Sequence, residues 1–125
     1  MISGEYKGLK GPIESLTNLV AYTLELKAGA KIDIDIPEER NSILYQLHGD
    51  TIVQNQEIGD KHLIHFSNDG EHIEIEAKSD SLILFLAGDP INEPVVSYGP
   101  YVMNSQTEIM EAMRDYQMGK MGLMV

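Results

Sequence analysis

The sequence contains no cysteine, which excludes a disulfide framework and any metal site built from thiolate ligands. This composition fits a reducing compartment, and we expect the chain to be cytoplasmic.

Basic residues are scarce, since 9 Lys and Arg stand against 20 Asp and Glu and give a formal net charge of -11. Nucleic acids and anionic membranes are bound by Lys and Arg, so we expect neither as a direct partner. No run approaches the ~18 apolar residues of a membrane span, and the opening MISGEYKGLKG has no apolar run behind its charges. We therefore expect no targeting leader and no membrane anchor.

The 125 residues are 42% hydrophobic and 23% charged, which is typical of a globular chain with a real core. This length is close to the commonest size of one domain, so we expect a single domain over residues 1–125.

Short alternating runs separated by turn residues extend over about residues 19–87 and indicate an all-β sandwich or barrel. Three runs each place apolar side chains on one strand face: Tyr22, Leu24 and Leu26; Ile32, Ile34 and Ile36; Ile43, Tyr45 and Leu47. Gly49-Asp50 predicts a tight reversal. Further strands are expected at residues 62–66, 71–77 and 81–87, and the last is apolar on both faces, which favours a central position.

The composition changes after Ala87. Residues 88–104 contain three prolines and two glycines, and proline cannot donate to a sheet ladder, so we expect an extended strap. Ser105 and Glu108 form a capping-box pair. Apolar residues at helical spacing follow, which predicts one helix over about residues 105–119.

Both ends of the chain carry distinctive runs, namely GDPINEPVVSYGPYVMN, the ending DYQMGKMG and the opening GEYKGLKGPI. These runs resemble the second domain of proteins of the pirin family. The resemblance implies a bicupin, in which two double-stranded β-helix barrels pack together and the first barrel carries the metal. We therefore expect a cupin jelly-roll barrel with a proline-rich strap and one C-terminal helix.

The metal-binding frame of a cupin, G-x5-H-x-H-x4-E-x6-G, can be placed on Gly29 and Gly49. Its ligand positions then fall on Asp35, Pro37 and Ser42, which cannot supply a facial set of ligands.

The second cupin motif adds a histidine three residues after a turn glycine, and counting from Gly70 reaches Ile73. If Ile73 faces the core, then His72 faces solvent. We therefore expect no metal, no cofactor and no catalytic residue in this chain.

The other polar groups carry no spacing signature. The four histidines are expected in surface or structural roles, although a metal site that combines His48 or His65 with Asp35 is an alternative. The acidic clusters are interpreted as solvated faces rather than general acid–base pairs.

The strap and the helix supply the candidate site, which we interpret as an interface or a ligand mouth. Its residues are Asn92, Glu93, Tyr98, Tyr101, Met110 and Met113. The alternative is that Glu93 and the tyrosine hydroxyls satisfy backbone groups where the strap docks. Further methionines add flexible apolar surface suited to packing against another chain: Met118, Met121 and Met124.

Three functions are compatible with these patterns. The leading hypothesis is a non-catalytic, metal-free cupin domain with an assembly or regulatory role, present as a homodimer or bound to a partner cupin domain. The resemblance also implies quercetin 2,3-dioxygenase-like activity, which would need a partner domain or an atypical metal site. The third is a barrel that binds a small apolar molecule among inward side chains, with Tyr45 as a polar handle.

Overall fold

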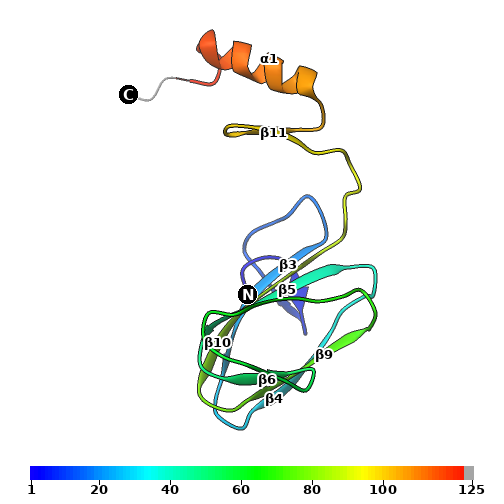
Figure 1. The fold of residues 1–125 in the computed structure, drawn as a ribbon, viewed down its shortest axis with the longest axis vertical. Coiled ribbons are helices and arrows are strands. Elements are labelled where there is room, and N and C mark those ends of the chain that lie inside the picture. Colours follow the sequence, from blue (N-terminus) through cyan, green and yellow to red (C-terminus); the bar gives the residue numbers. More distant parts are fainter. Residues whose placement is uncertain (123–125) are drawn as a thin grey trace. The chain divides into compact units, whose positions relative to one another are not determined.

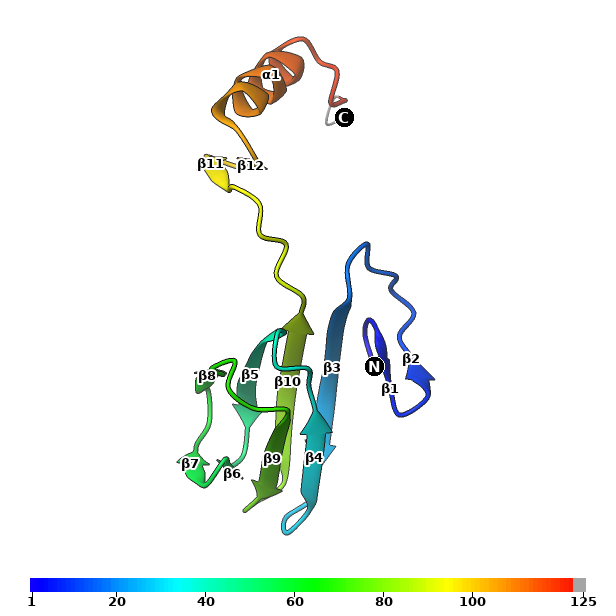
Figure 2. The ribbon, with the colours of Figure 1, turned by 90° about the vertical axis from the view of Figure 1, so that its right-hand side faces the viewer.

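The structure is a computed structural model that describes residues 1–122. The chain divides into two compact units, of which the first is Met1–Pro90 and the second begins at Ile91 (Figures 1 and 2). The first unit is built from strands and the second contains the helix.

The first unit contains two four-stranded antiparallel sheets, with strand orders β3-β10-β5-β8 and β4-β9-β6-β7. Figure 2 shows β10 between β3 and β5, and the second sheet in front of the first. The strand bounds are β3 Leu19–Leu26, β4 Lys31–Asp35, β5 Asn41–His48, β6 Thr51–Val53, β7 Gln56–Ile58, β8 Leu63–His65, β9 His72–Ala77 and β10 Ser81–Gly88. The predictions of an all-β barrel and of a central last strand are confirmed.

The core lies between the two sheets. Alternate residues of each strand face inward, as the pleat of a strand requires, and large aliphatic and aromatic side chains from both sheets fill the space. Phe85 from β10 and Ile34 from β4 are each only 1% exposed. The expected inward position of Ile73 on β9 is confirmed, and its neighbour His72 is exposed.

The prediction that Ile43, Tyr45 and Leu47 share one face of β5 is confirmed, but the expected position of Tyr45 inside the barrel was wrong. Ile43, Tyr45 and Leu47 lie on the outer face, and the intervening Ser42, Leu44 and Gln46 are buried. Alternation identifies which residues share a face, but it does not identify the core face when both faces carry apolar side chains.

The turn after β5 is closed by buried polar groups. Gln46 and Thr51 are both 0% exposed. The Thr51 hydroxyl donates to Gln46 Oε1 at 3.0 Å, and Gln46 Nε2 donates to the carbonyls of His48 at 2.8 Å and Gly49 at 3.1 Å. Gly49 has a φ of +84°, so the predicted tight reversal at this glycine is confirmed.

The N-terminal segment lies beside the edge strand β3. The backbone of Ser3 pairs with Ala21 of β3. A small hairpin of β1 (Glu5–Tyr6) and β2 (Leu9–Lys10) follows. Tyr6 on this hairpin stacks on Tyr22, with ring centroids 5.1 Å apart.

The second unit is a hairpin followed by a helix. Strands β11 (Val96–Tyr98) and β12 (Tyr101–Met103) pair, and α1 spans Gln106–Gln117 and contacts both strands. Ser105 is the N-cap, as the capping-box pair predicts, and its Oγ accepts the backbone N–H of Glu108 at 3.3 Å. The sequence pattern missed this hairpin, whose turn carries Pro100 outside the ladder.

Met124, one of the methionines assigned to the apolar surface, lies outside the described residues. Within residues 1–122, no helix has the length and hydrophobicity needed to cross a membrane.

Candidate functional site

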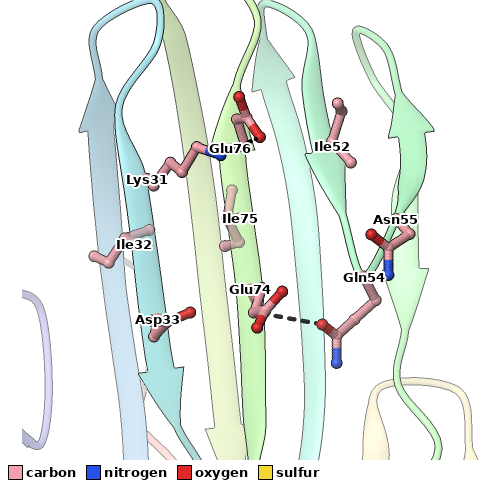
Figure 3. A pocket seen from close by; sticks show the side chains of 9 residues that line it. All are labelled: Lys31, Ile32, Asp33, Ile52, Gln54, Asn55, Glu74, Ile75 and Glu76. Atoms are coloured by element: carbon pink, nitrogen blue, oxygen red, sulfur yellow. Dashed lines mark hydrogen bonds and ion pairs between the residues drawn. The ribbon is translucent and has the colours of Figure 1, made fainter.

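The outer face of the sheet β4-β9-β6-β7 is polar (Figure 3). Lys31 and Glu76 form an ion pair of 2.9 Å across β4 and β9. The side chain of Gln54 accepts the backbone N–H of Glu74 at 3.2 Å, and it donates to the carbonyl of His72 at 3.1 Å. These groups line a depression of about 240 Å³ with Asp33 and Ile52, and such a charged face is suited to water.

The outer face of the sheet β3-β10-β5-β8 is apolar instead. We call this surface the apolar face; its residues are Ile43, Tyr45 and Leu47 on β5, Leu63 on β8, and Leu82, Leu84 and Leu86 on β10. The strand register makes the set continuous, because Tyr45 pairs with both Leu84 and Leu63. Leu63 remains 63% exposed and Leu47 37% exposed.

Charged and imidazole side chains border the apolar face. Glu25 on β3 and His48 on β5 both pair with Leu82 at one border, and His65 on β8 pairs with Ile43 at another. A partner can therefore cover Leu84 and Leu86 without taking an ionised group out of water. Burial of an unpaired charge would destabilise the complex. Contiguous exposed apolar surface of this kind marks an interaction site.

Sequence reasoning missed the apolar face, although the composition of β10 pointed to it. Strand β10 was recognised as apolar on both faces, and antiparallel strands with one face in water usually alternate apolar and polar residues instead. The third hypothesis placed Tyr45 of β5 inside the barrel, whereas it lies on this surface.

The two glycines of the metal-binding frame share a backbone conformation, but the three ligand positions differ in burial. Gly29 and Gly49 both have positive φ, +82° and +84°. Asp35 and Pro37 are exposed at the end of β4, whereas Ser42 is buried.

The first two positions line an open depression of about 550 Å³, and its further lining residues are Ile36, Glu38, Glu39, Glu71 and His72. A single carboxylate, a proline and a hydroxyl do not fit an iron-type metal, and the position of the fourth ligand is the buried Ile73. Within residues 1–122, no group of three or more His, Asp or Glu side chains is placed to hold a metal ion.

The histidines make local contacts. His62 Nδ1 lies 3.1 Å from the carbonyl oxygen of Gly59 and 3.0 Å from that of Asp60. His48 Nδ1 lies 3.4 Å from the Asp60 carboxylate, and both side chains are largely exposed.

The strap residues singled out from the sequence lie in the second unit. Asn92 and Glu93 are exposed, and Glu93 accepts a hydrogen bond of 3.0 Å from Asn104 Nδ2. Tyr98 and Tyr101 face each other in the register of β11 and β12.

The helix residues singled out lie on α1. Met110 is 57% exposed and Met113 is half-buried. The hairpin and the helix also carry exposed Tyr98, Val102 and Tyr116, so this unit has apolar surface of its own.

This chain is similar in sequence to a known domain family and to longer proteins that contain such a domain. The family described as the pirin C-terminal cupin domain matches residues 21–122. A pirin-like protein of Solanum lycopersicum is 36% identical over 126 residues, which are 98% of this chain and 43% of that protein. Pirin of Homo sapiens is 32% identical over 127 residues, 98% of this chain and 44% of that protein.

A solved structure shares the fold closely. The crystal structure of a quercetin 2,3-dioxygenase from Acinetobacter baumannii is similar with a TM-score of 0.90 at 33% identity, over 98% of this chain and 43% of that one. The chain thus spans about two fifths of the length of the curated relatives it matches.

Proposed function

Since this chain belongs to the pirin family and corresponds to its C-terminal cupin domain, we propose that it is a non-catalytic assembly domain that binds a second cupin barrel through the apolar face. The observation that carries the proposal is the difference between the two sheets. One outer face is charged, and the other is built from leucine, isoleucine and tyrosine side chains.

Covering the apolar face would remove apolar side chains from water and stabilise a complex. Apolar surface removed from water stabilises a complex by about 25 cal/mol per Å², and stable interfaces bury roughly 800 Å² on each partner. Leu63 and Leu47 are exposed, and Leu84 and Leu86 on the central strand β10 are half-buried. Aromatic and aliphatic residues at the centre with charges at the rim are the usual anatomy of a protein interface.

A second copy of this chain meets the requirements for the partner. Two apolar faces related by a two-fold axis are identical and therefore mutually apolar, and an isologous contact of this kind closes without leaving a free face. The proposed homodimer places two barrels back to back. The charged outer faces of the sheets β4-β9-β6-β7 then remain in water, which fits the net charge of -11 per chain.

The residues at the ligand positions of the metal-binding frame support the non-catalytic part of the proposal. Pro37 and Ile73 cannot bind a metal, and Ser42 is buried next to the core. The 33% identical quercetin 2,3-dioxygenase supports a second candidate function, in which a domain of this kind assists an oxygenase. For this chain, such activity would depend on a partner barrel that holds the metal.

The experiment is sedimentation velocity at micromolar concentration on the wild-type chain and on matched variants. We expect a dimer for the wild type and a monomer for Leu84→Glu, because a buried, unpaired carboxylate at the centre of an interface raises the dissociation constant by about 30-fold or more. Leu63→Glu should weaken the dimer in the same direction, and its 63% exposure makes it harmless to the fold.

The control is Ile52→Glu, which adds the same charge on the polar outer face and should leave the dimer unchanged. Circular dichroism confirms that each variant is folded. A folded wild-type monomer, or equal weakening by Ile52→Glu and Leu84→Glu, would refute the assembly role. Consumption of quercetin by the isolated chain with added Fe²⁺ would refute the non-catalytic role.

A further inference from the structure

The connection between β8 and β9 carries an Asp-Gly pair on the surface of the first unit. Residues 67–71 are all exposed and belong to no strand or helix. Asp69 and Gly70 lie in the middle of this connection. The carboxyl group of Asp69 and the backbone nitrogen of Gly70 are the two groups of an intramolecular reaction, and both belong to residues in contact with water.

The backbone nitrogen of Gly70 is free of the hydrogen bonds that hold other nitrogens in place. Within the part of the chain that the structure describes, its N–H donates to no backbone carbonyl. Asp60 is also exposed, but the N–H of the following residue, Lys61, donates to the Gln46 carbonyl at 2.7 Å. Exposure is therefore shared by the two aspartates, whereas a free neighbouring nitrogen distinguishes Asp69.

Gly70 is not required by the fold. Its φ lies outside the left-handed region, and a Cβ at this position would meet nothing within 4 Å. The absence of a side chain leaves the nitrogen open to approach and the backbone free to rotate. The Gly70 nitrogen can therefore reach Cγ of Asp69 without disturbing a neighbouring residue.

The reaction between these two groups is a cyclisation with loss of water. The Gly70 nitrogen gives up its proton and attacks Cγ of the protonated Asp69 carboxyl; a C–N bond forms, and the C–OH bond breaks with release of one water molecule. The product is a five-membered succinimide. One water molecule then adds to either of its carbonyls, and addition at the α-carbonyl leaves Gly70 bonded to Cγ of Asp69. Water is lost and regained, so no oxidant or reductant is needed and the mass does not change.

We propose that Asp69 is a modification site, at which the exposed Asp-Gly pair converts to isoaspartate without an enzyme. The backbone then gains one methylene group, and the free carboxylate moves to the α-carbon. An isoaspartyl carboxylate is the group that S-adenosylmethionine-dependent protein carboxyl methyltransferases methylate. The modified connection is thus a substrate for an enzyme of that class.

The modification leaves the two sheets in place. At one end of the connection, the N–H of Phe66 donates to the Ser42 carbonyl at 3.1 Å, and at the other end the N–H of Ile36 donates to the Glu71 carbonyl at 2.8 Å. These hydrogen bonds fix the connection on both sides of the altered bond. An exposed loop tip between fixed ends tolerates a change of backbone length.

The test is prolonged incubation of the full chain at neutral pH, followed by proteolysis and electron-transfer-dissociation mass spectrometry, which separates isoaspartate from aspartate at equal mass. We expect isoaspartate to accumulate at Asp69 and not at Asp60. Because the protonated carboxyl reacts, accumulation should be faster in mildly acidic than in mildly alkaline buffer. Methyl transfer from labelled S-adenosylmethionine by a protein isoaspartyl methyltransferase should increase in parallel.

Two matched variants separate the steps. Asp69→Glu keeps the charge and should abolish the signal, because a six-membered ring forms far more slowly. Gly70→Ala keeps the carboxyl and should slow accumulation severalfold, because the methyl group hinders the nitrogen. Circular dichroism confirms that both variants are folded.

A short peptide of residues 66–72 provides the unfolded reference. Conversion in the peptide but not in the folded chain would overturn the proposal, since the fold would then protect Asp69. Equal accumulation at Asp60 and Asp69, or equal rates for the wild type and Gly70→Ala, would overturn it as well. None of these results depends on the oligomeric state, so failure here is distinguishable from failure of the assembly role.

Discussion

Replacing Gln46 by leucine tests the buried network that closes the turn after β5. The amide of Gln46 connects the Thr51 hydroxyl to the carbonyls of His48 and Gly49, with distances from 2.8 to 3.1 Å. Leucine fills similar space without any polar atom, so it leaves these groups without their partner. A buried group that loses its partner costs about 1–3 kcal/mol, and we expect Gln46→Leu to lower the free energy of unfolding by about 2–3 kcal/mol.

Thr51→Val provides the second edge of a double-mutant cycle. In the wild-type background it leaves Gln46 Oε1 unpaired, and we expect a loss of about 1–2 kcal/mol. In the Gln46→Leu background the hydroxyl of Thr51 is already unpaired, so its removal should cost close to zero. The coupling between the two positions should therefore be about 1 kcal/mol or more.

Urea unfolding of the four proteins measures this coupling, provided that the slope with denaturant stays constant. The single variants should unfold at lower urea concentration than the wild type, and the double variant close to Gln46→Leu. If Thr51→Val lowers the free energy of unfolding by the same amount in both backgrounds, the hydrogen bond between Thr51 and Gln46 does not stabilise the fold.

Two further predictions concern the turn at Gly49 and the response to acid. Gly49→Ala should lower the free energy of unfolding by about 2 kcal/mol or more, because φ is +84° and a Cβ would meet the carbonyl oxygen of Asp80. The control in the same thermal melts is Gly70→Ala, where a Cβ meets nothing within 4 Å. Hydrogen bonds from Asn18 and Arg40 lower the pKa of Asp89 below its ordinary value of 3.8. The unfolded chain then binds the proton at Asp89 more tightly than the folded chain does, so the free energy of unfolding should fall as the pH drops below about 4. Between pH 6 and pH 3, the melting temperature should fall less for Asp89→Asn than for the wild type. An equal fall for the two proteins would contradict this role of Asp89.

The sequence predicted most of the architecture because its patterns are local. The alternation at Tyr22, Leu24 and Leu26 places these residues opposite Phe85, Ile83 and Ser81 of β10, with their side chains on the inner face. The helix was delimited within a few residues by its cap, since Ser105 satisfies a backbone donor that has no helical partner.

The candidate site was less predictable because it depends on which side of a sheet is covered. On β5, Ser42 and Gln46 face inward although they are polar. The buried amide of Gln46 is hydrogen-bonded to groups in the turn that follows, and strand alternation does not predict these bonds. Hydrophobicity alone therefore assigned Tyr45 to the interior. The tyrosine that does face inward is Tyr22, which is 3% exposed and whose hydroxyl has no hydrogen-bond partner among the described residues.

The assembly role also changes the interpretation of the strap. The sequence made Asn92, Glu93, Tyr98 and Tyr101 the leading interface candidates, whereas the continuous apolar set lies on β5, β8 and β10. The strap and helix keep exposed apolar residues, and their participation in an interface stays a prediction.

Methyl cross-saturation between two differently labelled copies of the chain tests the central claim most directly. One copy is deuterated with protonated Leu and Ile methyl groups, and the other is fully protonated and saturated at its aromatic resonances. We expect strong signal loss at Leu63, Leu84 and Leu86 on the apolar face and none at Ile52 on the polar face. Signal loss centred on Ile52, or no loss at any of these methyl groups, would contradict the assignment of the apolar face as the assembly surface.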